Sequence, residues 1–241
     1  MKKAFVSGGS GGIGEEIVKK LCENGYTVIF SYNKNPQNAA RIEKEIFDKG
    51  GSAKSVKLDV KNADEVSNVA QNTLRLYKHI DLLVCNAGVS LTGLAHQTTQ
   101  EEYDEIMDVN CKGVHLLCKS FLPSMIEQKS GCIINVSSYA GIDGIAAESV
   151  YSMSKGGVVA YTLALAKEAG LCGIRVNALC PGAINTSMNG NLSAEEKAAL
   201  CQNIIFKRFG TPREVANAAA FLAEASYVTG TVLSVDGGLV I

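Results

Sequence analysis

The chain has 241 residues, of which 46% are hydrophobic and 20% are charged, enough for one large buried core and inconsistent with wholesale disorder. Its 23 Lys and Arg residues balance 24 Asp and Glu residues, and no basic block of the kind that binds nucleic acid is present. The longest charge-free apolar stretch near the middle, 156–166, is too short to span a bilayer, and residues 1–9 contain no signal-peptide core. We therefore expect a cytoplasmic protein that binds neither nucleic acid nor membrane.

Neither the cysteines nor the histidines form a metal-binding or disulfide pattern. The eight cysteines include no CxxC pair, so in a chain of this size we expect them to be reduced and mostly buried. His79, His96 and His115 show no spacing typical of metal ligands. The sequence therefore predicts no metal site.

Apolar runs that favour strands alternate with helical patterns along the whole chain. Several of these runs are continuously apolar, which is typical of strands covered on both faces, and the alternation favours parallel pairing. The sequence predicts a single α/β domain over 1–241, a doubly wound parallel sheet of about seven strands with helices on both faces. The predicted strands are 4–7, 27–31, 53–58, 82–85, 132–136, 175–179 and 231–235, and the clearest helices are 13–24, 37–49 and 63–77.

A glycine-rich turn, residues 7–14, lies between the first predicted strand and the first helix. Backbone N–H groups at such a helix start can face a pyrophosphate. Gly8 would allow the tight turn, Gly12 the close backbone approach and Gly14 the close packing of helix on strand. The spacing differs from the common GxGxxG pattern, so a merely tight turn is the alternative to the nucleotide site that we predict.

The end of the second predicted strand indicates which nucleotide binds. NAD sites usually place a carboxylate there to accept the ribose hydroxyl, but residues 31–35 contain none. Lys34 could instead pair with a 2′-phosphate, so NADP(H) is the predicted cofactor. The alternative is that Lys34 is an ordinary solvated lysine.

Tyr151 and Lys155 are four residues apart, which places them on one face of a helix, one turn from each other. An ammonium about 4 Å from a phenol favours the phenolate by about 4 kcal/mol at an effective dielectric constant of about 20. This attraction opposes the effect of burial on the tyrosine pKa. The pair is therefore predicted to act as a proton donor poised near neutral pH, although such a spacing also arises by chance.

Two further segments suggest assembly and gating. The helix predicted over 151–169 has one charge, Lys155, among its first sixteen residues and is apolar all round, so a second subunit is expected to cover it. We expect a homo-oligomer, with a homotetramer favoured and a dimer left open. Residues 185–205 are predicted to form a substrate lid, or else a surface loop without a role. Capping boxes predict helix starts at Ser193 and Thr211.

Several motifs, taken in order, resemble those of the short-chain dehydrogenase/reductase family over the whole chain. They are SGGSGGIG at 7–14, Cys85-Asn86-Ala87-Gly88, Asn110, Ser137-Ser138, Tyr151-x3-Lys155, Pro181-Gly182 with Thr186, and Asp236-Gly237-Gly238. The resemblance implies a Rossmann-type fold and an NAD(P)-dependent oxidoreductase.

The resemblance also implies roles for individual residues. Tyr151 would be the acid/base, and Lys155 would hold the nicotinamide ribose and lower the tyrosine pKa. Ser138 would hydrogen-bond the substrate carbonyl, and Asn110 would anchor a water that relays protons through Lys155. The cofactor would contact Ser7, Gly8, Ser10, Gly12, Ile13, Gly14, Tyr32, Asn33, Lys34, Asp59, Val60, Asn86, Gly88, Tyr151, Lys155, Pro181, Gly182, Ile184 and Thr186.

Within that family the chain is most similar to the 3-oxoacyl-acyl-carrier-protein reductases of bacterial fatty acid synthesis. The implied reaction is hydride transfer from NADPH to a 3-oxoacyl thioester, with Tyr151 protonating the alkoxide. The sequence departs from the NADP-using pattern at Gly11, where an Arg is usual. The resemblance implies two basic residues that dock the carrier protein beside the mouth of the active site. Lys129 matches the first position, but the second is occupied by the neutral Cys172.

Three further hypotheses remain open at this stage. Lys207 and Arg208 could contact an acidic carrier protein in place of the missing docking cation. A short-chain oxidoreductase acting on a sugar, a steroid or a small ketone is the second functional reading. The third is a non-enzymatic NADP-binding or scaffold protein, which would have no need of a proton relay.

Overall fold

The computed structural model describes residues 1–190 and 192–239. Within them, seven parallel strands form one sheet, as predicted, and their order is β3-β2-β1-β4-β5-β6-β7. The strands are β1 (Lys3–Val6), β2 (Thr27–Tyr32), β3 (Ser52–Lys57), β4 (Leu82–Cys85), β5 (Gly131–Val136), β6 (Ile174–Pro181) and β7 (Val232–Val235).

Helices connect the strands and continue beyond the sheet. They are α1 (Gly12–Glu23), α2 (Pro36–Asp48), α3 (Ala63–Tyr77), α4 (Gln100–Met107), α5 (Gly113–Gln128), α6 (Ala140–Asp143), α7 (Ser149–Gly170), α8 (Ala194–Gln202) and α9 (Pro212–Glu224). Short 3₁₀ turns lie at Ala95–Gln97 and Ser187–Asn189, and a π-helical turn at Asp108–Lys112 joins α4 to α5. Both predicted capping boxes are present, at the starts of α8 and α9.

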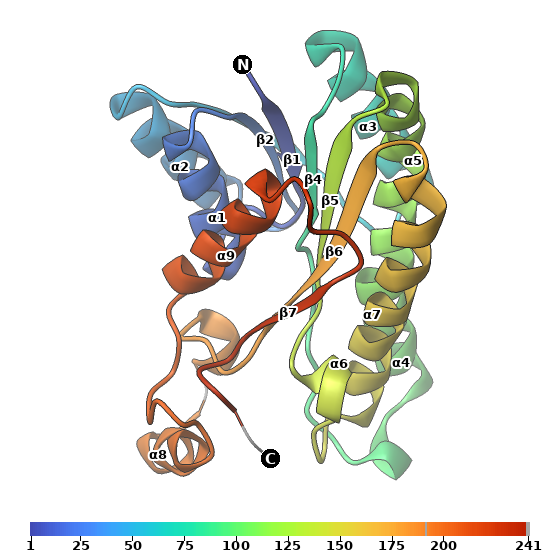
Figure 1. Ribbon diagram of the computed structural model, residues 1–241. Helices are drawn as coiled ribbons and strands as arrows, with labels where there is room; N and C mark the ends of the chain where they lie inside the picture. Colours follow the sequence, from blue (N-terminus) through green and yellow to red (C-terminus); the bar gives the residue numbers. More distant parts are fainter. Residues whose placement is uncertain (191, 240–241) are drawn as a thin grey trace.

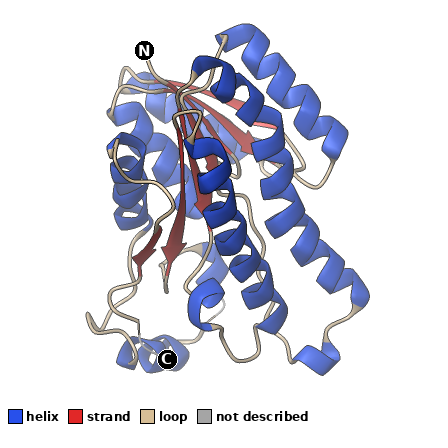
Figure 2. Cartoon of the chain, turned by 45° about the vertical axis from the view of Figure 1, so that its right-hand side comes forward, coloured by secondary structure: helices blue, strands red, loops and turns tan. Residues whose placement is uncertain are grey.

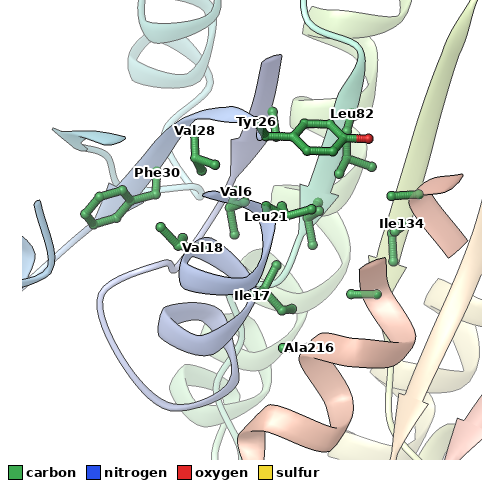
Figure 3. Close-up of a cluster of buried hydrophobic side chains, with 14 of the residues drawn as sticks. Val6, Ile17, Val18, Leu21, Tyr26, Val28, Phe30, Leu82, Ile134 and Ala216 are labelled. Atoms are coloured by element: carbon green, nitrogen blue, oxygen red, sulfur yellow. The ribbon is translucent and has the colours of Figure 1, made fainter. Parts of the chain in front are cut away.

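The sheet is covered on both faces. Figure 1 shows α1, α2 and α9 on one side and α3, α5 and α7 on the other, and Figure 2 shows the strands enclosed between the helices. Figure 3 shows the core between the sheet and the first of these helical layers, where Val6 of β1 packs near Ile17 of α1 and Ala216 of α9. Burial on both faces explains why β4 is apolar throughout and why nearly all residues of β5 and β6, including Asn135 and Asn177, are buried.

Helix α7 leaves one face outside this core. Val158, Leu165 and Ala169 are buried against the sheet, whereas Met153 and Ala160 lie exposed on the outer side. The expected homo-oligomer would cover this exposed apolar face. Among the described residues, no helix is both long and apolar enough to cross a membrane.

The strand order places a ligand-binding crevice at the carboxyl ends of the central strands. The chain starts at β1, moves outward to β3, and then returns to β4 on the other side of β1. Loops that leave β1 and β4 therefore diverge, and in such sheets ligands bind outside the carboxyl ends of the strands at this switch point. Helices α6 and α8 lie beyond the same ends (Figure 1). The site is expected there.

Candidate active site

One cleft of about 480 Å³ lies at the carboxyl ends of the strands and contains nearly all of the predicted site residues. It extends from the loop after β1 to the segment after β6. The predicted residues that line it are Gly8, Ser10, Gly12, Ile13, Gly14, Tyr32, Asn33, Lys34, Asp59, Val60, Asn86, Gly88, Ser138, Tyr151, Lys155, Pro181, Gly182, Ile184 and Thr186. The fold thus brings together motifs that are up to about 180 residues apart in the sequence.

The glycine turn has the geometry of a phosphate cradle. Gly8 and Gly12 adopt φ values of 64° and 53°, which L side chains rarely adopt. No side chain caps the start of α1 at Gly11, so the N–H groups of the first turn stay available to an anion. A Cβ at Gly14 would lie 2.1 Å from the Gly8 carbonyl oxygen, so helix and turn are in direct contact. These features fit the pyrophosphate of a dinucleotide.

Ser7 is the one predicted cofactor contact that does not line the cleft. It is fully buried, and its hydroxyl oxygen accepts hydrogen bonds from the backbone N–H groups of Asn86 (2.9 Å) and Ala87 (3.0 Å). The Asn86 side chain in turn donates to the carbonyl oxygens of Ser7 (3.1 Å) and Gly8 (3.0 Å). Ser7 therefore joins the two diverging loops beneath the cleft, and its contact with the cofactor stays a prediction.

Tyr151, Ser138 and Lys155 meet in the deeper part of the cleft. Helix α7 carries Tyr151 and Lys155 on one face, and both side chains are buried. A hydrogen bond links the side chains of Ser138 and Tyr151. The Lys155 ammonium donates to the Val136 carbonyl oxygen at 3.0 Å and lies 5.9 Å from the centre of the tyrosine ring. The two hydroxyls can therefore approach one substrate oxygen together, with a cation close behind them.

The expected lowering of the Tyr151 pKa is absent. Burial raises the pKa of Tyr151, opposed only by the bond from Ser138, and burial lowers the pKa of Lys155 to about 8. The Lys155 ammonium is directed at the Val136 carbonyl oxygen and lies 5.9 Å from the centre of the tyrosine ring, and besides burial the groups that shift the Tyr151 pKa are Ser138, Glu148 and Cys180. A raised pKa keeps Tyr151 protonated, which is the state that a proton donor in a reduction requires.

Asn110 lies behind the cleft, in the π-helical turn, and is fully buried. Its Oδ1 accepts from the Val89 N–H at 2.9 Å, and its Nδ2 donates to the Val89 carbonyl oxygen at 2.9 Å and to Ser154 Oγ at 3.0 Å. Both donor hydrogens of the amide are therefore used within the chain. Asn110 fixes the loop after β4 against α7, and its predicted water-anchoring role is left untested.

Sequence reasoning missed several residues of the cleft. Some of them directly adjoin predicted motifs at the carboxyl ends of strands. That position in the sequence is the signal that could have found them. Val109 directly precedes the predicted residue Asn110, whereas Glu105 has no such signal, because α4 reaches the cleft only through the tertiary fold. The missed lining residues are Gly11, Ser31, Asn35, Leu58, Lys61, Ala87, Val89, Glu105, Val109, Val136, Ser137, Ser187 and Met188.

Comparison with known proteins agrees with this geometry. Residues 8–240 match a family model described as enoyl-(acyl carrier protein) reductase, which represents short-chain dehydrogenases/reductases. The chain belongs to the short-chain dehydrogenase/reductase family. It is 40% identical to the 3-oxoacyl-[acyl-carrier-protein] reductase of Synechocystis sp. over 98% of this chain and 96% of that protein. It is 39% identical to the corresponding reductase of Chlamydia muridarum over 99% and 97%.

Solved structures of other family members have the same fold. A protein from Beutenbergia cavernae, provisionally assigned as an NAD(P)-dependent gluconate 5-dehydrogenase and solved with bound NADP at low occupancy, is 33% identical with a TM-score of 0.93. The match covers 98% of this chain and 96% of that one. A provisionally assigned gluconate dehydrogenase from Agrobacterium tumefaciens is 28% identical with a TM-score of 0.95, over 98% and 95%. This short-chain dehydrogenase/reductase is an oxidoreductase.

The predicted carrier-docking residues of this short-chain dehydrogenase/reductase do not lie beside the cleft. Lys129 shortly precedes the first residue of β5, and Cys172 shortly precedes the first residue of β6. Both therefore lie at the amino edge of a parallel sheet whose cleft is at the carboxyl edge. The expectation that Lys129 adjoins the mouth was wrong for a single chain, because residue spacing does not reveal at which edge a loop lies.

Substitution of Gly14 by Ala tests the cradle of this family member. The added Cβ would lie 2.1 Å from the Gly8 carbonyl oxygen and 2.6 Å from Asn86 Nδ2, so the turn must move. We expect nucleotide affinity to fall at least about tenfold and stability to fall by about 1–3 kcal/mol, as overpacking does. Gly170→Ala, at the end of α7 and outside the cleft, is the control, because nothing lies within 4 Å of its Cβ. Equal nucleotide affinities of the two variants in fluorescence titrations would contradict the assignment of the glycine turn to pyrophosphate binding.

Proposed function

We propose that this chain reduces the 3-oxo group of an acyl thioester borne by acyl carrier protein to the 3-hydroxy group in fatty acid synthesis, with NADPH as reductant. The observation that supports it is the convergence of the Tyr151 and Ser138 hydroxyls, backed by Lys155, in one cleft with the glycine turn. The relatives from Synechocystis sp. and Chlamydia muridarum are named for this reaction.

The chemistry divides between the cofactor and the chain. NADPH, when bound, supplies the hydride. Ser138 and Tyr151 would hydrogen-bond the carbonyl oxygen of the substrate, which orients it and stabilises negative charge as it develops. Tyr151 would then donate its proton to that oxygen, while the Lys155 ammonium stabilises the phenolate that forms.

The residues around the nucleotide end of the cleft support a preference for NADPH over NADH. Lys34 lines the cleft just after β2, between Asn33 and Asn35. This segment has no carboxylate that would repel a 2′-phosphate. The cleft residues assigned above to cofactor and catalysis are part of this proposal, and Ser7 contributes by holding the loops.

Replacing Lys34 by Ala is expected to raise the KM for NADPH about tenfold and to leave the KM for NADH unchanged, since one charge-assisted bond is worth about 1.5–3 kcal/mol. Lys44→Ala, an exposed lysine on α2 outside the cleft, is the control. Adding Gly11→Arg to the Lys34→Ala variant should restore the preference for NADPH over NADH, because nothing lies within 4 Å of the Cβ at position 11. Equal effects of Lys34→Ala on both cofactors in initial-rate measurements would contradict the assignment.

The lid, the carrier contact and the assembly are further parts of the proposal. Thr186, Ser187 and Met188 line the cleft, which supports a lid over 185–205, of which residue 191 lies outside the described residues. Lys207 and Arg208 follow the lid, but Arg208 is paired with Glu214 at 2.6 Å, which leaves Lys207 as the better carrier contact. The proposed assembly is a homotetramer in which a second subunit covers α7. The proposed location is the cytoplasm.

Loss of NADPH absorbance with acetoacetyl-coenzyme A, beside the same assay with NADH, tests the proposal. Faster turnover with NADPH is expected. The gluconate dehydrogenases among the structural relatives favour a second candidate, oxidation of a sugar acid hydroxyl. Turnover of gluconate with NADP, together with no reduction of the thioester, would overturn the thioester assignment and support that candidate.

A further inference from the structure

Lys61 and Glu105 both line the cleft, and the mechanism above uses neither of them. Lys61 lies in the loop between β3 and α3, whereas Glu105 lies on α4, 44 residues later in the chain. The Lys61 ammonium donates to Glu105 Oε2 at 2.5 Å. This ion pair therefore joins, at the wall of the cleft, two elements that meet only through the tertiary fold.

The backbone is fixed on each side of this ion pair. The Lys61 N–H donates to Asp59 Oδ1 at 3.0 Å, and the Asp59 N–H donates to Glu65 Oε2 at 3.0 Å. Helix α4 begins with a complete capping box between Thr99 and Glu102. The pair thus links two segments that each hold their own conformation, and it acts on the separation between them.

The part of the cleft beside the pair suits a nucleotide base. Leu58, Val60 and Val109 line it and belong to the buried core, each with an exposed fraction of 8% or less. In the proposed complex the nicotinamide lies at Tyr151 and the pyrophosphate at the glycine turn, so the adenosine half occupies the remaining end, where Lys34 also lies. The base then rests on an apolar surface, as ligands of such clefts commonly do.

The pair lies at the outer edge of this end of the cleft. The side chains of Lys61 and Glu105 are 31% and 49% exposed. Glu105 raises the pKa of Lys61, and the negative charges of Asp59 and Asp108 act in the same direction, so the ammonium stays charged at neutral pH. Paired in this way, the two charges largely cancel the field that each alone would exert on a bound phosphate. The contribution of the pair is therefore to hold the two segments together.

We propose that Lys61 and Glu105 are positioning residues that form a latch at the adenosine end of the cleft: their ion pair holds the loop after β3 against α4 and slows the release of the nucleotide. The inference rests on the proposed function, because it takes NADPH to be the ligand of this cleft. A partly exposed ion pair stabilises only modestly, so the latch changes the release rate severalfold and does not decide whether the nucleotide binds.

The sign of the effect in two single variants separates the latch from simple attraction between charges. Lys61→Met and Glu105→Gln each break the ion pair, and both should speed the release of NADPH about two- to fivefold. Stopped-flow displacement of bound NADPH, followed by its fluorescence, measures this rate. If Lys61 only attracted the phosphates, Lys61→Met would speed release and Glu105→Gln, which removes a negative charge, would slow it. Such opposite changes, or no change in Glu105→Gln, would overturn the inference.

A charge-swapped double variant tests the pair itself at unchanged net charge. Lys61→Glu combined with Glu105→Lys can form the same ion pair in the reverse direction, so the release rate should return to within about twofold of the native rate. Lys54→Met is the matched control, because Lys54 pairs with Glu43 at 3.2 Å outside the cleft, and it should leave release unchanged. Release from the swapped variant that is no slower than from the single variants would overturn the inference.

A competition experiment locates the effect in the cleft. Adenosine 2′,5′-bisphosphate has the base and the 2′-phosphate but no nicotinamide, so each single variant should weaken its binding by about the same factor as that of NADPH. An unchanged dissociation constant would show that the pair does not act on the adenosine half and would overturn the inference. Absence of thioester reduction by the native chain would contradict the proposed function instead, while the release rates still decide the inference about Lys61 and Glu105.

Discussion

Tyr151→Phe will lower kcat for thioester reduction by about a thousandfold, the usual contribution of a positioned acid. The phenyl ring fills the same space, so packing on α7 is retained and only the hydroxyl that bonds Ser138 is lost. Nucleotide binding depends mainly on the glycine turn and the loops after β2 to β4, so the dissociation constant for NADPH should change by less than about threefold. Single-turnover rates and fluorescence titration measure the two quantities.

Ser138→Ala is the matched comparison for that experiment. It removes the hydroxyl partner of Tyr151 but leaves the proton donor in place, so the loss in kcat should be smaller, about ten- to a hundredfold. A Tyr151→Phe variant with native turnover would show that another group protonates the substrate. A loss of NADPH binding equal to the loss of turnover would indicate damage to the site rather than removal of an acid.

Lys155→Met is expected to abolish most activity while leaving the protein as stable as the native chain or more so. Burial lowers the pKa of Lys155 from 10.5 to about 8, so holding the ammonium at neutral pH costs about 3 kcal/mol. Against this, the Val136 carbonyl oxygen loses its donor, which costs about 1–2 kcal/mol. The net gain in the free energy of unfolding should be about 1–2 kcal/mol, measured by denaturant titration.

The pH dependence of this gain has a definite sign. Between about 8 and 10.5 the lysine is neutral in the folded native chain but still charged in the unfolded one. The unfolded state therefore binds more protons, and native stability rises with pH relative to the variant. The advantage of Lys155→Met should shrink across that window. An advantage that grows with pH, or a variant less stable at neutral pH, would contradict the buried-ammonium assignment.

The sheet could be predicted from sequence because most of its strands are short, largely apolar runs that alternate with helices. The predicted strand limits differ from the observed ones by at most two residues, as at β6, which continues to Pro181. The segment from α4 to α5 was not among the clearest helices, because Pro123 lies inside α5 and a π-helical turn interrupts the periodicity. Local propensity does not reveal such an interruption.

The composition of the site followed from motifs, but its electrostatics did not. Lys155 was assumed to face the Tyr151 hydroxyl, and only the fold shows that it donates to Val136. Likewise, the bonds between Ser7 and Asn86 join residues about 80 apart in the sequence, across the switch point of the sheet. Hydrogen-bond partners of this kind depend on tertiary contact, for which one sequence has no local signal.

If the Tyr151 and Ser138 hydroxyls bind a carbonyl oxygen, the chain should choose a 3-oxoacyl thioester over an enoyl thioester in a competition experiment. The matched family model is described for an enoyl reductase, whereas the similar proteins from Synechocystis sp. and Chlamydia muridarum reduce a 3-oxo group by name. The chain would be given equal amounts of acetoacetyl and crotonyl thioesters with deuterated NADPH, and the products analysed by mass spectrometry. We predict deuterium in the 3-hydroxybutyryl product and unchanged crotonyl thioester. Deuterium in a saturated butyryl product, with the 3-oxo thioester unchanged, would show that Tyr151 and Ser138 do not act on a 3-oxo group.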